Sequence, residues 1–327
     1  MNKRARLETI FAGQQPDRPA VALWRHWPVD DQRGDTLARA TLEFQQTYDF
    51  DFVKVTPSSN YCVADYGAET RWEGNLEGTR LWGPRLIQEP EDWLRLRPLD
   101  PRRGLLGQIL QADRLIGEAL GPDTPFIQTI FNPLSQAKNL AGDRFIPHLR
   151  QHPDAVKAGL ATLTESILRF VEALKSTGAA GIFLAVQHAQ FGLLTQEEYA
   201  TFGRPLDLQI LEATEGMWFN LLHLHGRDVM FDLLADYPVQ VINWHDRETP
   251  PSLAQALQRT DKTLCGGLRQ WETMVRGAPE QVLQEGREAI QATGGRRFIL
   301  GTGCVTPIVA PVGNIHAARQ AVESPAD

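Results

Sequence analysis

Cysteine is scarce in this chain, and long apolar runs are absent. Only three cysteines occur among 327 residues, at positions 62, 265 and 304. They are too few and too widely spaced for a disulfide framework, so we expect a reducing, cytoplasmic compartment. No run approaches the roughly 20 apolar residues of a membrane span, and no apolar signal-peptide core follows the basic N-terminus. We therefore expect no membrane association.

An excess of positive charge is also lacking. The chain has 33 Lys and Arg against 40 Asp and Glu, a formal net charge of −7. This balance argues against nucleic acid as the main partner, although a local basic pocket still suits an anionic small-molecule substrate. The hydrophobic content of 42% and charged content of 22% are ordinary for a globular protein.

Short apolar runs alternate with helical patterns along the chain. Eight such runs predict strands, at residues 19–24, 50–55, 125–131, 181–186, 218–225, 239–244, 263–268 and 297–300. Helix signals stand between them, including a capping box at 195–198 and a glycine stop at 294–295. Alternation of this kind predicts an α/β fold with a parallel sheet, a (β/α)₈ TIM barrel in one domain over 1–327.

Two features qualify this fold prediction. Residues 60–100 break the alternation, and the segments 71–75 and 86–87 predict a β-hairpin inserted after the second strand. A doubly wound open sheet is the alternative fold. It is disfavoured because no glycine-rich dinucleotide fingerprint follows an early strand.

Two of the predicted strands lead into side chains that bind metals. His223 and His225 are two residues apart on a strand, so they point to the same face. Cys304 follows the last predicted strand. Two imidazoles and a thiolate suit Zn²⁺ and leave one coordination position open. The structural interpretation is that the histidines are hydrogen-bonded core residues and the cysteine is a small buried hydrophobe.

Further polar side chains, and five of the eight histidines in all, stand at predicted strand ends. Barrel active sites are built there, so this clustering predicts an enzyme. Four residues are expected to bind substrate: His26, Asn132, Gln187 and Asn243. Arg25 is suited to clamp an anion, and His188 or His245 to transfer protons.

Several of these residues have a structural interpretation as well. Asn132 precedes a proline, which is typical of a turn, and His26 stands between two tryptophans against which it can pack. Asp246 is a fourth, acidic metal ligand, a partner that orients a histidine, or a helix cap. From the residues alone these alternatives stay open.

Motifs along nearly the whole chain are similar to those of a known superfamily. They are Pro-Asp-Arg-Pro-Ala-Val at 16–21 with Arg25, Tyr-Asp-Phe-Asp-Phe-Val-Lys at 48–54, Leu-Thr-Gln-Glu-Glu-Tyr at 194–199 with Phe202 and Pro205, and Gly-Thr-Gly-Cys at 301–304. With them the chain resembles the uroporphyrinogen decarboxylase superfamily, which includes zinc-dependent corrinoid and coenzyme M methyltransferases. The resemblance implies a barrel enzyme, a methyltransferase or a carboxy-lyase.

The methyltransferase branch carries His-x-Cys after strand five and a cysteine after strand eight, all binding zinc. Here the corresponding residues are His223, His225 and Cys304, with one cysteine replaced by histidine. Asp246 stands near the acidic ligand of the more distant methionine synthase. This resemblance implies that zinc holds a substrate thiol as thiolate, and that a corrinoid protein or similar donor supplies the methyl group.

The decarboxylase branch is the alternative, with a carboxylated tetrapyrrole as substrate and no metal. It implies that Arg25 binds carboxylate and that His188 or His245 protonates the intermediate. Only Arg25 remains of that branch's arginine-rich loop, and no carboxylate occurs between Thr56 and Asn60, where its essential aspartate stands. A third hypothesis is a non-catalytic barrel that binds a tetrapyrrole or a corrinoid protein. The superfamily also implies a homodimer.

Overall fold

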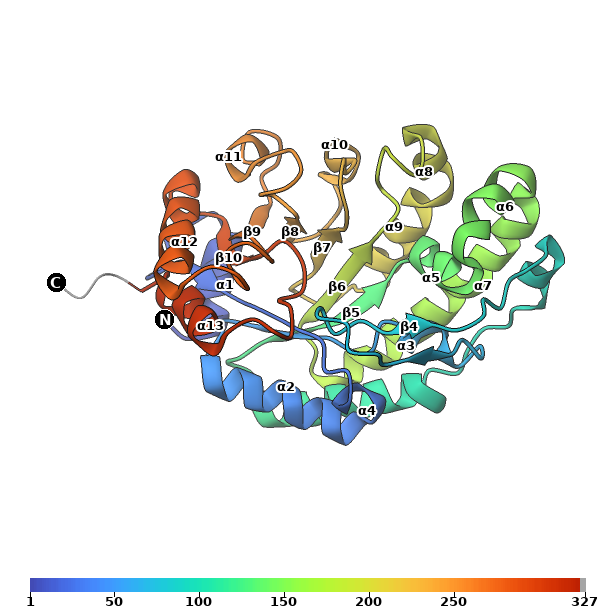
Figure 1. The fold of residues 1–327 in the computed structure, drawn as a ribbon, viewed down its shortest axis with the longest axis horizontal. Coiled ribbons are helices and arrows are strands. Elements are labelled where there is room, and N and C mark those ends of the chain that lie inside the picture. Colours follow the sequence, from blue (N-terminus) through green and yellow to red (C-terminus); the bar gives the residue numbers. More distant parts are fainter. Residues whose placement is uncertain (324–327) are drawn as a thin grey trace.

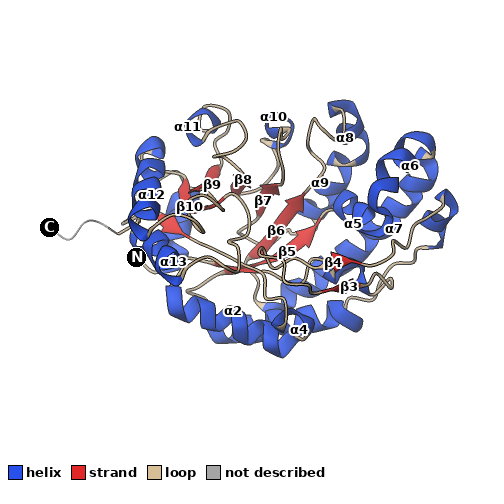
Figure 2. Cartoon of the chain, in the orientation of Figure 1, coloured by secondary structure: helices blue, strands red, loops and turns tan. Residues whose placement is uncertain are grey.

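Eight parallel strands form one curled sheet, and helices pack around its outer side (Figures 1 and 2). This computed structural model describes residues 1–323. In their order across the sheet, the strands are β1 (Ala20–Val21), β10 (Phe298–Thr302), β9 (Thr263–Leu268), β8 (Val241–Trp244), β7 (Leu221–Leu224), β6 (Gly181–Val186), β5 (Phe126–Phe131) and β2 (Val53–Val55). Each predicted apolar run overlaps one of them, which confirms the α/β barrel.

Asp51, just before β2, brings the two outer strands of the sheet together. Its backbone N–H donates to the Val21 carbonyl of β1 over 2.9 Å, and its carboxylate accepts from the Val21 N–H over 2.8 Å. Arg6 and Arg18 each donate to the same buried carboxylate, over 2.6 and 2.8 Å. The β1 and β2 ends are therefore neighbours, as they are in a closed barrel.

The connections between strands are mostly helical. The helices are α1 (Lys3–Phe11), α2 (Gly34–Tyr48), α3 (Tyr61–Ala64), α4 (Gly104–Leu120), α5 (Pro133–Ala141), α6 (Phe145–Gln151), α7 (Pro153–Leu174), α8 (Gln196–Phe202), α9 (Arg204–Glu212), α10 (Phe231–Leu234), α11 (Leu253–Ala256), α12 (Pro279–Thr293) and α13 (Val312–Gln320). The predicted capping box at Thr195 and Glu198 opens α8, and Gly294 ends α12 in the left-handed conformation. None of the helices within residues 1–323 combines the length and apolar character needed to cross a bilayer.

The predicted insertion after β2 is present, but its strands have other bounds than predicted, and the first predicted segment, 71–75, overlaps the observed strand only at Arg71. β3 (Thr70–Arg71) pairs with β4 (Leu81–Trp82) as an antiparallel hairpin. The second strand was predicted at 86–87, which is wrong. Ile87 is buried instead, and its N–H donates to the Leu140 carbonyl of α5. An apolar pair that packs on a helix has the same sequence pattern as a short strand.

The hairpin loop also reaches the neighbouring strand ends at the barrel mouth. The Leu76 carbonyl accepts a hydrogen bond of 2.9 Å from the Ile308 N–H, in the loop after β10. A Cβ added to Gly78 would lie 2.5 Å from the Cβ of His26, so glycine is needed for this close approach. The insertion thus partly covers the ends of β1 and β10.

Candidate metal centre

Four metal-binding side chains meet at the carboxyl ends of three strands, β7, β8 and β10. One ligand atom each from His223, His225, His245 and Cys304 can be chosen so that all four lie within 4.8 Å of one another. His223 lies on β7, and His225 follows it on the same face. His245 follows β8, which pairs with β7 in the register that places His223 beside Asn243. Cys304 follows β10 and comes from a distant part of the chain.

A glycine allows the Cys304 loop to reach the histidines. A Cβ on Gly303 would lie 2.7 Å from the His245 Cα and 3.0 Å from the Trp244 carbonyl oxygen. Any side chain at this position would push the two loops apart. The Gly-Thr-Gly-Cys motif therefore has a physical reason, because it brings the thiol against the β8 loop.

Two of the imidazoles are oriented by partners outside the cluster. The Asn243 amide donates to the Cys265 and Thr302 carbonyls over 2.9 and 3.1 Å. Its oxygen is thus left to accept from His223 Nδ1, 2.6 Å away. In His245, Nδ1 lies 3.0 Å from a Glu248 carboxylate oxygen. In both rings this leaves Nε2 free to donate its lone pair to a metal, an arrangement typical of histidine ligands.

The electrostatics of the cluster favour a thiolate. Burial by itself raises the pKa of the Cys304 thiol, but its interactions with the imidazoles of His223, His225 and His245 outweigh burial and hold that pKa well below its usual value. Burial lowers the pKa of His245, yet Cys304 and Glu248 raise it to about 10. A thiolate surrounded by imidazoles is the form in which cysteine binds metals.

This donor set fits zinc. Nitrogen and sulfur donors in a group of four, on rigid strand ends, are what tetrahedral Zn²⁺ sites use. The structure brings together the three predicted ligands and adds His245, for which the sequence suggested proton transfer. The signal for His245 was present, since it is a histidine at a strand end beside the strand of the other two.

Asp246 lies outside this cluster, contrary to its prediction as a metal ligand. Its carboxylate accepts a 3.0 Å hydrogen bond from the Gly267 N–H of β9 and is almost fully buried. Burial raises the pKa of Asp246 to about 7, although the Gly267 hydrogen bond opposes this. Consecutive residues of an extended chain point to opposite sides, so His245 faces the cluster and Asp246 does not.

Asn132, which was predicted to bind substrate, makes structural contacts with its side chain. Its side-chain oxygen caps α5 by accepting from the Ser135 N–H, and its amide donates to the Asp207 carboxylate over 2.9 Å. Asp207 in turn accepts from the Tyr199 and Tyr237 hydroxyls. The predicted substrate residue Asn243 likewise supports His223. Both amides are fully buried and already paired.

Arg25 was predicted to clamp an anion at the barrel mouth, and the structure does not place it there. Its guanidinium stacks on the Trp27 ring, 4.7 Å from the centroid. Burial lowers the pKa of Arg25, and Tyr48 of α2 opposes that shift. Arg25 therefore lies between β1 and α2. The residue before it, Trp24, points into the barrel and packs on Phe183 of β6, 5.5 Å between ring centroids.

The remaining predicted residues lie around the cluster. His26 is buried, and burial followed by the charge of Lys54 lowers its pKa to about 4. His188 packs edge-on against Phe145, and burial is the main cause that lowers its pKa to about 3. Gln187 is half-buried at the end of β6. None of the three is paired with a carboxylate within the described residues.

Sequence reasoning missed Lys54, which lies on β2 and is 7% exposed. The overall composition does not single out Lys54, but it is a charged residue between two valines of an apolar run. A lysine in such a position is rarely buried without a reason. That pattern is the signal by which it could have been found.

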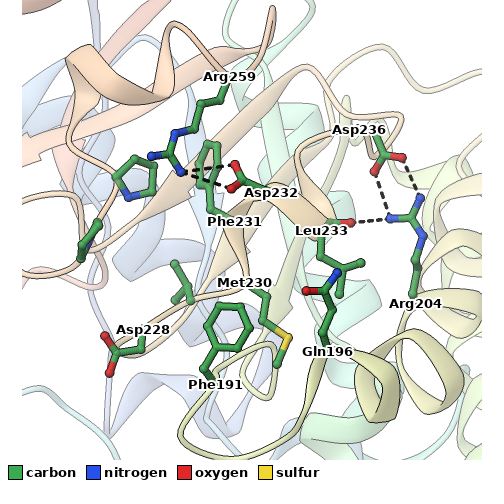
Figure 3. Close-up of a pocket in the computed structure, with 13 residues that line it drawn as sticks. Phe191, Gln196, Arg204, Asp228, Met230, Phe231, Asp232, Leu233, Asp236 and Arg259 are labelled. Atoms are coloured by element: carbon green, nitrogen blue, oxygen red, sulfur yellow. Dashed lines mark hydrogen bonds and ion pairs between the residues drawn. The ribbon is translucent and has the colours of Figure 1, made fainter.

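A groove of about 600 Å³ lies near these strand-end loops, and Figure 3 shows its lining. Its two arginines are paired, Arg204 with Asp236 at 2.7 Å and Arg259 with Asp232 at 3.2 Å. No residue of the His/Cys cluster lines it. The groove therefore offers no unpaired arginine.

A barrel whose strand ends gather ionisable groups in this way is typical of an enzyme. Comparison with known families agrees. Residues 2–325 match the family model described as uroporphyrinogen decarboxylase (URO-D), so the chain belongs to the uroporphyrinogen decarboxylase family. It is an enzyme of the methyltransferase or a related type within that superfamily.

Several curated relatives and solved structures are similar to it. The chain is 22% identical over 297 residues to the methylcobamide:CoM methyltransferase MtbA of Methanosarcina acetivorans, covering 90% of this chain and 85% of that protein. It is 20% identical over 297 residues to MtaA of Methanosarcina barkeri, covering 89% and 85%. A methyltransferase structure from Methanosarcina mazei superposes with a TM-score of 0.85 at 17% identity, covering 98% of each chain. The last similarity shows the fold.

Proposed function

We propose that this protein is a zinc-dependent methyltransferase that moves a methyl group from a corrinoid protein or a similar donor to a thiol acceptor. The observation that carries the proposal is the convergence of three imidazoles and one low-pKa thiol within 4.8 Å at the barrel mouth. The names of the curated relatives, methylcobamide:CoM methyltransferases, support the same reaction type and a corrinoid-bearing partner.

His223, His225 and Cys304 are residues that would hold zinc, with His245 as a fourth donor. Because a tetrahedral catalytic site keeps one position open, one of these four donors would have to give up its place to the acceptor sulfur. When bound, zinc would keep the sulfur of the acceptor as a nucleophilic thiolate at neutral pH. The chain contributes a site whose donors are already set. Asn243 fixes the His223 ring and Glu248 fixes the His245 ring. The surrounding imidazoles lower the pKa of Cys304 and so favour its thiolate form.

The decarboxylase alternative has less support. Arg25 stacks on Trp27 between β1 and α2, and this position gives no support to a contact with a substrate carboxylate beside the cluster. Asp65, the first carboxylate after β2, is occupied elsewhere, because it accepts from the Leu105 and Leu106 N–H groups of α4. We therefore expect no coproporphyrinogen from uroporphyrinogen. The non-catalytic hypothesis predicts tight corrinoid or tetrapyrrole binding with no turnover.

The proposal is tested by methyl transfer from methylcobalamin to a small thiol. Zinc-loaded protein is mixed anaerobically with methylcobalamin and 2-mercaptoethanesulfonate, and loss of the methyl–cobalt bond is followed by absorbance. We expect thiol-dependent demethylation, and a loss of at least about 100-fold in Cys304→Ser. His316→Ala, on α13 away from the cluster, is the matched control and should retain activity. Zinc-loaded protein inactive with methylcobalamin and with methylated corrinoid proteins would overturn the proposal.

A further inference from the structure

Asp113 is a carboxyl group on the buried face of α4, away from the metal centre. Its side chain is fully buried, and neither carboxylate oxygen has a hydrogen-bond partner among residues 1–323. Burying an ionised carboxylate without a partner is strongly unfavourable. Buried polar groups in native proteins are nearly always paired, so the surroundings of Asp113 call for an explanation.

The packing of α4 on β5 places Asp113 over Gln128. A Cβ on Gly117 would lie 3.2 Å from the Phe126 ring, so these two residues meet at the helix–strand interface. The chain runs in opposite directions along α4 and β5, because only residues 121–125 join them. Asp113 precedes Gly117 by one helical turn, and Gln128 follows Phe126 on the same face of the strand. Both steps measure about 6–7 Å, so the two polar side chains face each other.

The groups around this pair have hydrogen-bond acceptors to spare but no free donor. Tyr61 of α3 is close to both residues: burial is the main cause that raises its pKa, Asp113 adds to this shift and Gln128 opposes it. The Tyr61 O–H, however, donates to the Thr129 carbonyl over 2.5 Å. Gln128 Nε2 donates to the same carbonyl over 3.2 Å, and Gln128 Oε1 has no partner within the described part of the chain. One amide oxygen and two carboxyl oxygens are thus left over.

The charges around Asp113 do not favour its ionised form. Burial raises the pKa of Asp113 well above its usual value, and the charge of Arg114, which is exposed, opposes this. On α3 the titratable neighbours are Tyr61 and Cys62, and burial raises the pKa of both, so they are neutral. β5 has no titratable residue, and the charged residues of α2 and α7, which pack beside α4, are exposed.

We propose that Asp113 is protonated in the folded protein and donates a hydrogen bond to Gln128 Oε1, so that the packing of α4 on β5 depends on one bound proton. A protonated carboxyl group has the O–H donor that this pair lacks. When the proton passes to solvent at higher pH, the remaining carboxylate has no donor, and its burial favours separation of α4 from the sheet.

The same helix supports the base of the hairpin insertion. Asp65, which follows α3, accepts hydrogen bonds of 2.9 and 3.0 Å from the Leu105 and Leu106 N–H groups in the first turn of α4. The insertion leaves the barrel after α3 and returns at α4. Loss of the Asp113 proton therefore loosens both α4 and the insertion that partly covers the barrel mouth.

Infrared spectroscopy tests for the proton directly, because a protonated carboxyl group and a carboxylate have separate stretching bands. In the difference spectrum between wild type and Asp113→Asn at pH 7.5, we expect wild type to show the band of one protonated carboxyl group. Asp261→Asn changes an exposed carboxylate and is the control, which should show a carboxylate band instead. A carboxylate band for Asp113 as well would overturn the proposal.

The pH dependence of stability is an independent test. The unfolded chain releases the Asp113 proton above about pH 4, whereas the folded protein retains it, so this group stabilises the fold less as the pH rises. Between pH 5 and 7 the unfolding constant of wild type, from urea titrations, should rise relative to that of Asp113→Asn by about tenfold per pH unit. Asp261→Asn should follow wild type. If Asp113→Asn lowers folded yield, Asp113→Leu serves in its place, and a constant ratio would refute the bound proton.

Hydrogen–deuterium exchange locates the effect within the fold. At pH 8.5 we expect the amides of α4 and of residues 65–104 to exchange faster in wild type than in Asp113→Asn. At pH 6 the two proteins should exchange at equal rates in these segments. A difference spread evenly over all helices would contradict the assignment of the effect to the packing of α4 on β5.

Discussion

The His223 ring is oriented by Asn243, whose other hydrogen bonds fix the direction of its amide. Both Asn243 amide protons go to backbone carbonyls, so the amide oxygen accepts from His223. The orientation and tautomer of the ring are thereby set before any ligand arrives. A hydrogen-bond partner of this kind increases the affinity for a metal, because the imidazole does not have to be reoriented when the metal binds.

Removing this support should weaken metal binding without abolishing the fold. In Asn243→Ala we expect zinc affinity to fall by about 10–100-fold, as is typical when the hydrogen-bond partner of a histidine ligand is lost. Competition with a chelator of known affinity measures it. Asn220→Ala is the control, since Asn220 is also buried and hydrogen-bonded but stands at the start of β7. Equal zinc affinity in Asn243→Ala and wild type would contradict this role.

His188 makes the fold sensitive to acid. Burial, with added repulsion from Lys138 and His225, lowers its pKa in the folded protein to about 3, whereas in an unfolded chain it is about 6.5. Between pH 6 and 4 the unfolded state therefore binds a proton that the folded state excludes. As the pH is lowered from 6 to 4, this group therefore reduces the free energy of unfolding by about 1.4 kcal/mol per pH unit.

His188→Phe should remove that contribution and keep the packing against Phe145. Urea titrations at pH 6, 5 and 4 would show a shallower decline in the free energy of unfolding than in wild type. His152→Phe, which replaces an exposed histidine, should leave the decline unchanged. A slope in His188→Phe as steep as that of wild type would mean that His188 takes up its proton in the folded state.

Among the elements, the junction of β1 and β2 depends most on a single side chain. Asp51 is fully buried and pairs with both Arg6 and Arg18. In Asp51→Asn two arginines lose a buried counter-charge, so we expect a loss of about 3–5 kcal/mol in the free energy of unfolding. Urea denaturation measures it. Asp35→Asn, which breaks an exposed pair with Arg33, should change stability little, and a similarly small loss in Asp51→Asn would refute the assignment.

The strands were predictable from sequence because each is an apolar run bounded by turn or helix signals. β6 and β9 have the predicted bounds, and β10 begins one residue later than predicted. The presence of the hairpin was predictable, but its second strand was not. Ile87 contacts α5 and does not belong to a strand. The apolar run of a strand can be recognised from the local sequence. The element against which an apolar residue outside a strand packs cannot be recognised in this way.

The site was predictable in part for the same reason. His223 and His225 share a face by the period of a strand, and Cys304 could be placed at a strand end. His245 and Asp246 are adjacent, and which one faces the cluster depends on how the chain leaves β8. The outward direction of Arg25 likewise depends on packing against α2. The direction in which a side chain points at the end of a strand is set by tertiary contacts, and the spacing of residues in the sequence does not reveal these contacts.

For the whole molecule, the prediction of one domain over residues 1–327 stays a prediction. The eight strands form a continuous sheet, and hydrogen bonds of Asp51 join its two edge strands, β1 and β2. We therefore expect one cooperative unfolding transition in differential scanning calorimetry of the metal-free protein. Two separate transitions at different temperatures would instead indicate two domains.

The metal content of the purified protein tests the account most directly. Tag-free protein, prepared without chelators, is analysed by inductively coupled plasma mass spectrometry, beside His223→Ala and the control His316→Ala. We expect about one zinc per chain in wild type and in the control, and a loss of most of it in a folded His223→Ala. Wild-type protein that contains no zinc and takes up none when Zn²⁺ is added would contradict it.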